Sequence, residues 1–119
     1  MPPVQVLFYR DIDDAVPMRE WLDGLPRKAQ AKCLARLKRL EDLGHELRRP
    51  EADYLRDAIY ELRVGLQGIH YRMLYFFCGR TTAVVSHGLV KRRVVPAEEI
   101  NRAVERRLTF EHDPKSRSE

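Results

Sequence analysis

Residues 59–90 read IYELRVGLQGIHYRMLYFFCGRTTAVVSHGLV, and this stretch decides the fold. β-Branched, aromatic and aliphatic side chains dominate three segments within it, at residues 59–64, 69–77 and 82–90, and short glycine-containing turns separate them. Apolar segments joined by such tight turns are typical of an antiparallel meander. We therefore predict three consecutive strands, each paired with the next.

A strand and two helices are predicted before this stretch. Residues 4–9 read VQVLFY, and their β-branched and aromatic side chains indicate a short strand. Apolar residues then recur at helical spacing, which predicts a helix that ends near Asp23 and holds Pro17 in its first turn. A second helix follows from Pro26 to Gly44. Because only Gly-Leu-Pro separates the two helices, we expect them to form a helical hairpin.

The remaining segments are predicted to be a loop, a last helix and a tail. Residues 45–57 are polar and contain Pro50, so we expect a connecting loop. Pro96 begins a helix with an apolar face, and residues 111–119 are expected to form a flexible C-terminal tail. The order β-α-α-β-β-β-α predicts an α+β fold, with a twisted antiparallel sheet covered by helices on one face, in a single domain of residues 1–110.

The composition fits one compact domain with a charged surface. The 119 residues are 44% hydrophobic and 34% charged, which argues against a disordered chain. Lys and Arg number 22 against 18 Asp and Glu, and this formal net charge of +4 permits attraction to phosphate without requiring it. No apolar segment is long enough to cross a membrane, and residues 1–5 do not begin a secretory signal. Cys33 and Cys78 form no disulfide framework, so we expect a reduced, cytoplasmic protein.

Two arginines are predicted to face each other in the central hairpin. Side chains alternate between the two faces of a strand, so Glu61 and Arg63 share one face. If the chain turns at residues 66–68, Arg63 and Arg72 lie nearly opposite each other. Adjacent guanidinium groups repel unless an anion lies between them, and a phosphate matches the planar donors of arginine.

A second basic cluster, Lys91, Arg92 and Arg93, follows the strand that contains His87. The antiparallel order brings this strand beside the previous one, so we expect both basic clusters to line one concave surface. Positive charge for the backbone and flat faces for the bases are what single-stranded RNA requires. The candidate aromatic residues are Tyr71, Tyr75 and Phe76.

Purely structural explanations stand beside each of these features. Glu61 can neutralise Arg63, Arg72 can bind a carboxylate on the last helix, and residues 91–93 can form a solvated strand end. The basic residues of the second helix fit an ordinary solvent face. The aromatic residues of the meander equally fit a hydrophobic core.

Several motifs taken together resemble one known family. In order and spacing they are similar to the HigB-like, phage-derived branch of the RelE/ParE toxins, over residues 4–107. The resemblance implies a RelE-like fold and the toxin component of a type II toxin–antitoxin system. The motifs are YELRV at residues 60–64, HYRMLYFF at 70–77, HGLVKR at 87–92, the proline-started helix at 96–100 and the helical pair at 21–26.

The resemblance also implies a metal-independent endoribonuclease, an mRNA interferase that cuts messenger RNA in the ribosomal A site without a cofactor. In this reaction the 2′-hydroxyl attacks the adjacent phosphate and leaves a 2′,3′-cyclic phosphate. By position, Arg63 and Arg72 would hold the phosphate, and Lys91 and Arg92 would stabilise the transition state. His87 would transfer a proton, although a histidine in the middle of a sheet is equally compatible with a structural role.

A cognate helix-turn-helix antitoxin is the partner that the resemblance implies, and operator DNA would be contacted only through it. We expect an acidic antitoxin segment to cover the basic face or the first two helices. One departure from the family concerns tyrosine, because many RelE relatives carry one near the C-terminal helix and this chain has none after Tyr75. Glu98 and Glu99 are alternatives for its role, or they simply favour the helix N-terminus.

Three other functions remain open at this point. The ParE branch of the same superfamily poisons DNA gyrase and needs no catalytic cluster. A nucleic-acid-binding module would use the same basic face without a reaction. A metal hydrolase would require His70, Cys78 and His87 to converge, but no metal-binding motif accompanies them.

Overall fold

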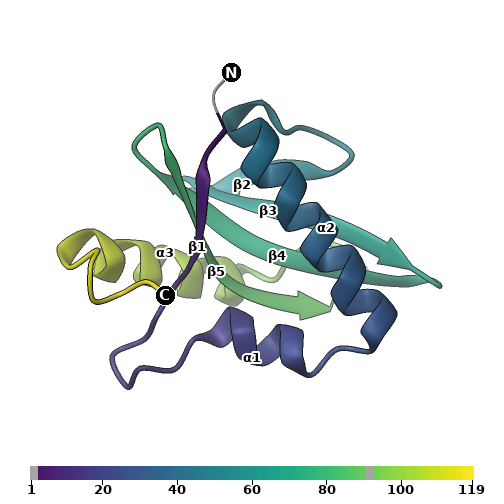
Figure 1. The fold of residues 1–119 in the computed structure, drawn as a ribbon, viewed down its shortest axis with the longest axis horizontal. Helices are drawn as coiled ribbons and strands as arrows, with labels where there is room; N and C mark the ends of the chain where they lie inside the picture. Colours follow the sequence, from purple (N-terminus) through teal and green to yellow (C-terminus); the bar gives the residue numbers. More distant parts are fainter. Residues whose placement is uncertain (1–2, 91–92) are drawn as a thin grey trace.

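A sheet of five strands, in the order β1-β5-β4-β3-β2, forms the centre of the molecule (Figure 1). The computed structural model describes residues 3–90 and 93–119. None of the helices within these ranges is both long enough and apolar enough to cross a membrane. The elements are β1 (Gln5–Phe8), α1 (Pro17–Asp23), α2 (Arg27–Leu43), a 3-10 helix (Gly44–Glu46), β2 (Ala52–Arg56), β3 (Ile59–Leu66), β4 (Ile69–Cys78), β5 (Thr82–Val90) and α3 (Ala97–His112).

The α+β class and the β3-β4-β5 meander are confirmed, but the predicted loop at residues 45–57 contains a further strand. This strand, β2, pairs antiparallel with β3 and places Asp53 opposite Glu61 and Tyr54 opposite Tyr60. Its connection to β3 is the pair Asp57-Ala58, and both residues have positive φ angles. Such hairpin turns usually contain glycine, and its absence here concealed the turn in the sequence.

The sheet is mixed, which corrects the expectation of a purely antiparallel one. β1 runs parallel to β5, and Gln5 is paired with Thr82 and Phe8 with Val85. No tight turn joins these two strands, because both helices and three other strands lie between them in the chain. Their relative direction is therefore not restricted to antiparallel.

Helices cover both faces of the sheet, whereas the sequence analysis predicted one covered face (Figure 1). α1 and α2 pack on the face that carries Met73 and Tyr75, and α3 packs on the face that carries Leu74 and Phe76. All four of these consecutive residues of β4 are buried. A strand that is apolar on both faces needs cover on both, which explains the third layer.

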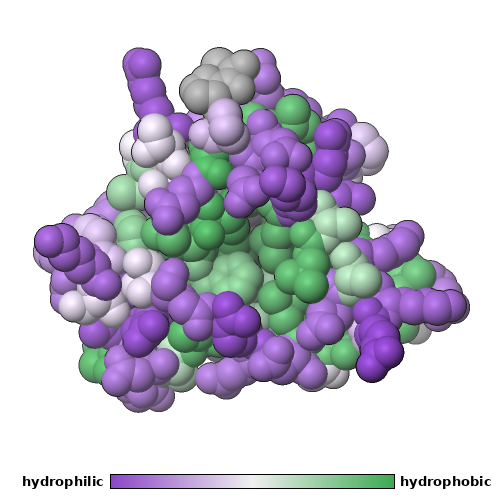
Figure 2. Space-filling model, viewed as in Figure 1, coloured by the Kyte–Doolittle hydropathy of each residue, from purple (hydrophilic) through white to green (hydrophobic). Residues whose placement is uncertain are grey.

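The face that carries α1 and α2 keeps some apolar surface. Figure 2 shows apolar side chains at the centre of this face and hydrophilic ones around them. Partly buried side chains from β1, α1 and β4 contact the core there. They include Phe8, Trp21 and Phe77.

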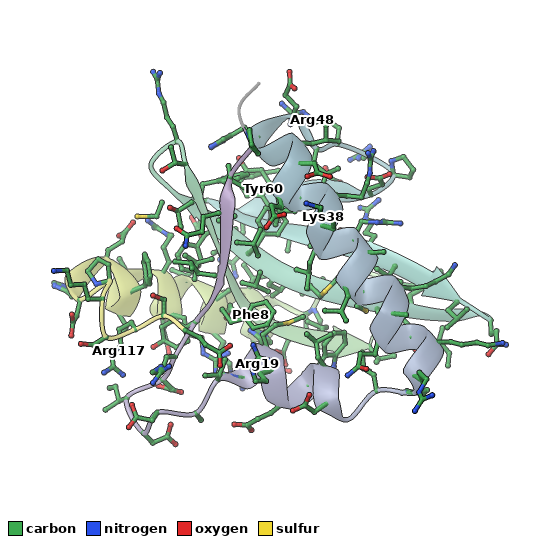
Figure 3. All side chains as sticks on the ribbon, in the orientation of Figure 1. Phe8, Arg19, Lys38, Arg48, Tyr60 and Arg117 are labelled. Atoms are coloured by element: carbon green, nitrogen blue, oxygen red, sulfur yellow. The ribbon has the colours of Figure 1, made fainter. Side chains whose placement is uncertain are left out.

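The segment after α3, which the sequence predicts to be flexible, is hydrogen-bonded to β1. The backbone N–H of Arg10 donates to the carbonyl of Arg117, and the N–H of Glu119 donates to the carbonyl of Phe8, at 2.8 and 2.9 Å. The guanidinium of Arg19 forms an ion pair with the carboxylate of Glu119 and lies over the Phe8 ring (Figure 3). β1 is an edge strand with open backbone donors and acceptors, which explains why a chain segment can pair with it.

Candidate functional site

Arg63 and Arg72 are direct partners across β3 and β4, as the sequence predicts. The chain turns at Gln67 and Gly68, which both have positive φ angles, and Leu66 is paired with Ile69. Two positive φ angles in a two-residue loop match the twist of the flanking strands. This turn fixes the register and therefore brings the two arginines together.

The carboxylate of Glu61 lies between these two arginines, so of the two alternatives left open by the sequence, an external phosphate or an internal carboxylate, the internal one occupies this position. Its Oε2 is 2.8 Å from Arg63 Nε and its Oε1 is 3.0 Å from Arg72 Nε. Only 5% of the Glu61 side chain is exposed, against 33% for Arg63 and 12% for Arg72. The alternative that Glu61 neutralises Arg63 is confirmed, and Arg72 pairs with this same carboxylate.

The ion pairs continue to the edge of the sheet. Asp53 of β2 receives a hydrogen bond of 3.1 Å from Arg63 Nη2 and lies 2.9 Å from Arg49 Nη2. The hydrogen bond from Arg49, together with the backbone N–H of Tyr54, holds the pKa of Asp53 below its ordinary value although partial burial opposes this shift. Arginines and carboxylates therefore alternate across three strands. We call Arg49, Asp53, Arg63, Glu61 and Arg72 the charged row.

A cavity of about 320 Å³ opens beside the charged row, on the face of the sheet that carries α3. Arg93 belongs to its lining, and the carbonyl of Arg93 accepts a hydrogen bond of 3.3 Å from Arg72 Nη2. The side chain of Arg56 also lines it and donates to Asn101 of α3. Four arginines thus meet at this cavity, which we call the arginine cavity. They are Arg56, Arg63, Arg72 and Arg93.

The predicted second cluster is only partly described. Lys91 and Arg92, the candidates for transition-state stabilisation, lie outside the described residues. Arg93, the last member of that cluster, lines the same cavity as Arg63 and Arg72. The two basic clusters therefore meet, through Arg93, on one hollowed surface.

His87 is buried on the α3 face and both of its ring nitrogens are hydrogen-bonded. Nδ1 lies 2.7 Å from Ser86 Oγ, and Nε2 lies 2.9 Å from Glu99 Oε1. Burial lowers the pKa of His87, and the bond to Glu99 opposes this shift only in part. The imidazole joins β5 to the first turn of α3, and it does not line the arginine cavity.

The aromatic residues proposed as stacking platforms belong to the core. Tyr71, Tyr75 and Phe76 are all at most 4% exposed, which confirms the core alternative. Burial raises the pKa of Tyr75, as expected for a phenol with little access to water. The exposed aromatic of this edge is instead Tyr54, which follows Asp53 in β2 and lies on the opposite face of the sheet, and it was missed in the sequence because its strand was expected to be a loop.

A metal site from His70, Cys78 and His87 is excluded by the topology. His70 and Cys78 lie at opposite ends of β4, about 26 Å apart at the usual rise of a strand. Within residues 3–90 and 93–119, no three histidine, cysteine, aspartate or glutamate side chains are grouped as metal ligands.

The fold and the arginine cavity define a small, basic α+β protein with a surface suited to anions. Residues 20–108 match the family model described as phage derived protein Gp49-like (DUF891), and the chain belongs to this family. The family is associated with RelE-like toxins of toxin–antitoxin systems. A comparison with curated proteins finds no match.

Proposed function

We propose that this chain is the toxin of a type II toxin–antitoxin pair, of the HigB-like kind, and that it cuts messenger RNA on the ribosome. The arginine cavity is the observation that carries the proposal. It gathers four guanidinium groups and two carboxylates, so it retains an excess of positive charge after its internal ion pairs are counted. Guanidinium groups donate bidentate hydrogen bonds to phosphate, and single-stranded RNA presents a phosphate at every nucleotide.

The reaction needs no oxidant or reductant, and water can accept the proton of the 2′-hydroxyl and supply the proton of the 5′-oxygen. The 2′-oxygen of one ribose bonds to the adjacent phosphorus, and the bond from phosphorus to the 5′-oxygen of the next nucleotide breaks. The products are a 2′,3′-cyclic phosphate and a 5′-hydroxyl, after the 2′-hydroxyl loses a proton and the 5′-oxygen gains one. Extra negative charge develops on the phosphoryl oxygens, and fixed donors aimed at those oxygens lower the barrier.

Glu61 explains why guanidinium groups can be fixed so closely together. An arginine has five N–H donors; Arg63 donates its Nε–H to Glu61, whereas Arg72 Nε lies 3.0 Å from Glu61 as an ion pair without hydrogen-bond geometry. The carboxylate holds both side chains in place and offsets their repulsion. In the proposed complex, the Nη N–H groups that are not donated to Asp53 and to the carbonyl of Arg93 bind the phosphate from the cavity side.

Lys91 and Arg92 supply further positive charge in this proposal. They directly precede Arg93, whose side chain lines the arginine cavity. We place His87 among the residues that hold the shape of the site, because its ring is buried and both nitrogens are engaged.

The proposed partner is a helix-turn-helix antitoxin, and the complex would contact operator DNA through that protein. The apolar surface beside α1 and α2 (Figure 2) lies on the opposite face of the sheet from the cavity and suits an amphipathic helix of the antitoxin, whereas the basic cavity suits an acidic segment. Binding of such a segment would block access of RNA to the cavity. A structure of the complex in which the antitoxin is remote from both surfaces would contradict this part of the proposal.

The test of the function uses a translating extract with a defined mRNA. The wild-type chain is expected to cut the mRNA only while it is translated. Arg72→Lys keeps the charge but loses the planar donors, and Arg93→Ala removes an exposed side chain without leaving a buried charge unpaired, so both are expected to reduce cutting at least tenfold. Arg80→Ala is the matched control, because it removes one exposed arginine from the turn between β4 and β5.

Three outcomes would contradict the proposal or its site, once DNA breaks and RNA binding are measured beside mRNA cutting. Intact mRNA together with gyrase-linked DNA breaks would identify a ParE-like gyrase inhibitor. Binding of RNA without cutting and without arrest of translation would identify a binding module. Equal cutting by wild type and by both cavity variants would show that the arginine cavity is not the site.

A further inference from the structure

A second cavity, of about 390 Å³, lies on the other side of β2. Its lining includes Arg48 and Arg49 from the segment before β2, and Tyr60 from β3. Asp53 and Tyr54 line this cavity and the arginine cavity as well. The two cavities therefore adjoin each other through these two residues of the edge strand β2, and we call the two cavities together the track.

Tyr54 stands where the two cavities meet, and its ring is both exposed and fixed. It is 52% exposed, the most exposed aromatic side chain among the described residues. Its hydroxyl accepts a hydrogen bond of 3.0 Å from the backbone N–H of Ala58, and its ring packs edge-on against Tyr60, with centroids 5.0 Å apart. A ring that is already ordered loses little conformational entropy when a flat ligand stacks on it.

Tyr60 supports this arrangement from inside the molecule. Its ring lies parallel to that of Tyr75, with centroids 5.4 Å apart, and Tyr75 is buried in the core. Figure 3 shows Tyr60 on the face of the sheet that carries α2, with Arg48 beyond it. The rings of Tyr75, Tyr60 and Tyr54 are therefore in contact one after another, from the core to the exposed ring of Tyr54.

The charge of the track is strongly positive. Six arginines and two carboxylates line the two cavities, and Asp57 next to them forms an ion pair of 2.6 Å with Arg56, which leaves an excess of three positive charges. Asp53 joins the two halves, because Arg49 binds it from one side and Arg63 from the other. Positive charge interleaved with an exposed aromatic ring suits an unpaired nucleic acid strand, whose bases are free to stack.

We propose that Tyr54 is a base-stacking residue of a second RNA subsite, which binds a nucleotide a few positions from the phosphate held in the arginine cavity. This inference rests on the proposed function and adds to it a second place where the toxin contacts the RNA. β2 is the edge strand, two strands or about 10 Å from β4, and Tyr54 lies on the opposite face of the sheet from Arg72, so the RNA strand would pass around the edge of β2 and span a few nucleotides between them. Arg48 and Arg49 then bind the backbone phosphate beyond the stacked base.

The test measures binding of a short single-stranded RNA labelled with fluorescein, at low salt, by fluorescence anisotropy. Tyr54→Ala is expected to weaken binding about 5- to 150-fold, the usual effect of removing one stacking partner. Tyr54→Phe keeps the ring and its contact with Tyr60 but loses the hydrogen bond from Ala58, so it is expected to retain most of the wild-type affinity. A thermal melt of each variant shows whether the protein remains folded.

Two further readouts separate stacking from a general loss of structure or charge. Placing 2-aminopurine at successive positions of the RNA is expected to reveal one position whose fluorescence is quenched by wild type and Tyr54→Phe but not by Tyr54→Ala. The dependence of affinity on salt is expected to be unchanged in Tyr54→Ala. Arg49→Ala, which removes a phosphate contact, is expected to reduce the slope of log affinity against log salt concentration by about 0.7.

The possible failures of the subsite and of the nuclease assignment are distinguishable. If Tyr54→Ala binds RNA as tightly as wild type, or if Tyr54→Phe weakens binding equally, the stacking subsite is wrong, whatever the cavity arginines do. Absence of RNA binding by the wild-type chain at low salt would also overturn it. If Tyr54→Ala alone weakens binding while the wild-type chain leaves translated mRNA intact, the subsite is supported and the nuclease assignment fails.

Discussion

The carboxylate of Glu61 holds Arg63 and Arg72 side by side, with Oε2 2.8 Å from one Nε and Oε1 3.0 Å from the other. Glu61→Gln removes this charge with little change of shape and leaves two adjacent guanidinium groups in a largely buried site. We expect the free energy of unfolding to fall by about 2–4 kcal/mol, which is slightly below the usual effect of breaking a buried pair because Arg63 is one-third exposed. Urea denaturation measures this change, and Glu105→Gln on the exposed face of α3 is the control.

An external anion should partly replace the missing carboxylate. Inorganic phosphate at millimolar concentration is expected to raise the melting temperature of Glu61→Gln more than that of wild type. In the variant the two guanidinium groups have lost their carboxylate partner, and phosphate can bind both of them in its place. Potassium chloride at equal ionic strength is the control for simple screening. If phosphate and chloride stabilise both proteins equally, the arginines do not form an anion site.

Gly88 allows α1 to approach β5 closely. A Cβ atom at this position would overlap the six-membered ring of Trp21, which also packs edge-on against Tyr71. Gly88→Ala is therefore expected to lower the free energy of unfolding by about 1–3 kcal/mol, as overpacking of a core does. Gly65→Ala in β3 is the matched control, because nothing lies within 4 Å of its added Cβ. Equal stability of the two variants would show that α1 can shift at no cost.

The burial of His87 predicts how stability depends on pH. Because burial lowers its pKa in the folded state, the unfolded chain binds this proton at higher pH than the folded chain does. Stability is then complete above the unfolded pKa near 6.5 and is lost as the pH falls below that value, by at most about 1.4 kcal/mol per pH unit. His87→Gln is expected to reduce this slope between pH 6.5 and pH 5. An unchanged slope would mean that the imidazole protonates equally well in both states.

Docking of the C-terminal segment on β1 is testable by amide hydrogen exchange. The Arg10 amide donates to the carbonyl of Arg117, whereas the Tyr9 amide donates to the carbonyl of Val85 in β5. Removal of residues 113–119 is expected to deprotect the Arg10 amide and to leave the Tyr9 amide protected. Fast exchange of the Arg10 amide in the full chain would instead support the flexible tail that the sequence suggests.

Local chemistry explains which parts of the fold the sequence could predict. The turn at Gln67-Gly68 and the alternation of the two strands around it were sufficient to pair Arg63 with Arg72. β2 was missed because its turn, Asp57-Ala58, adopts positive φ angles without glycine. The four consecutive apolar residues at 73–76 indicate a strand that is covered on both faces. This signal was overlooked because only the alternation of side chains between the two faces was considered.

The candidate site shows a different limit. The sequence could place Glu61, Arg63 and Arg72 on one face, but it left open whether the anion between the arginines is internal or a ligand. The arginine cavity forms only when the segment that contains Arg93 folds against β2 and β4, and that contact depends on the packing of α3. Tertiary contacts of this kind leave no periodic pattern in a sequence.

The chemistry of the cut ends tests the central claim most directly. Messenger RNA recovered from a translating extract should carry new 2′,3′-cyclic phosphate and 5′-hydroxyl ends with the wild-type chain, and these ends should be at least tenfold rarer with Arg72→Lys and Arg93→Ala but unchanged with Arg80→Ala. Intact mRNA with the wild-type chain, or cut ends that bear a 3′-hydroxyl and a 5′-phosphate, would contradict the account.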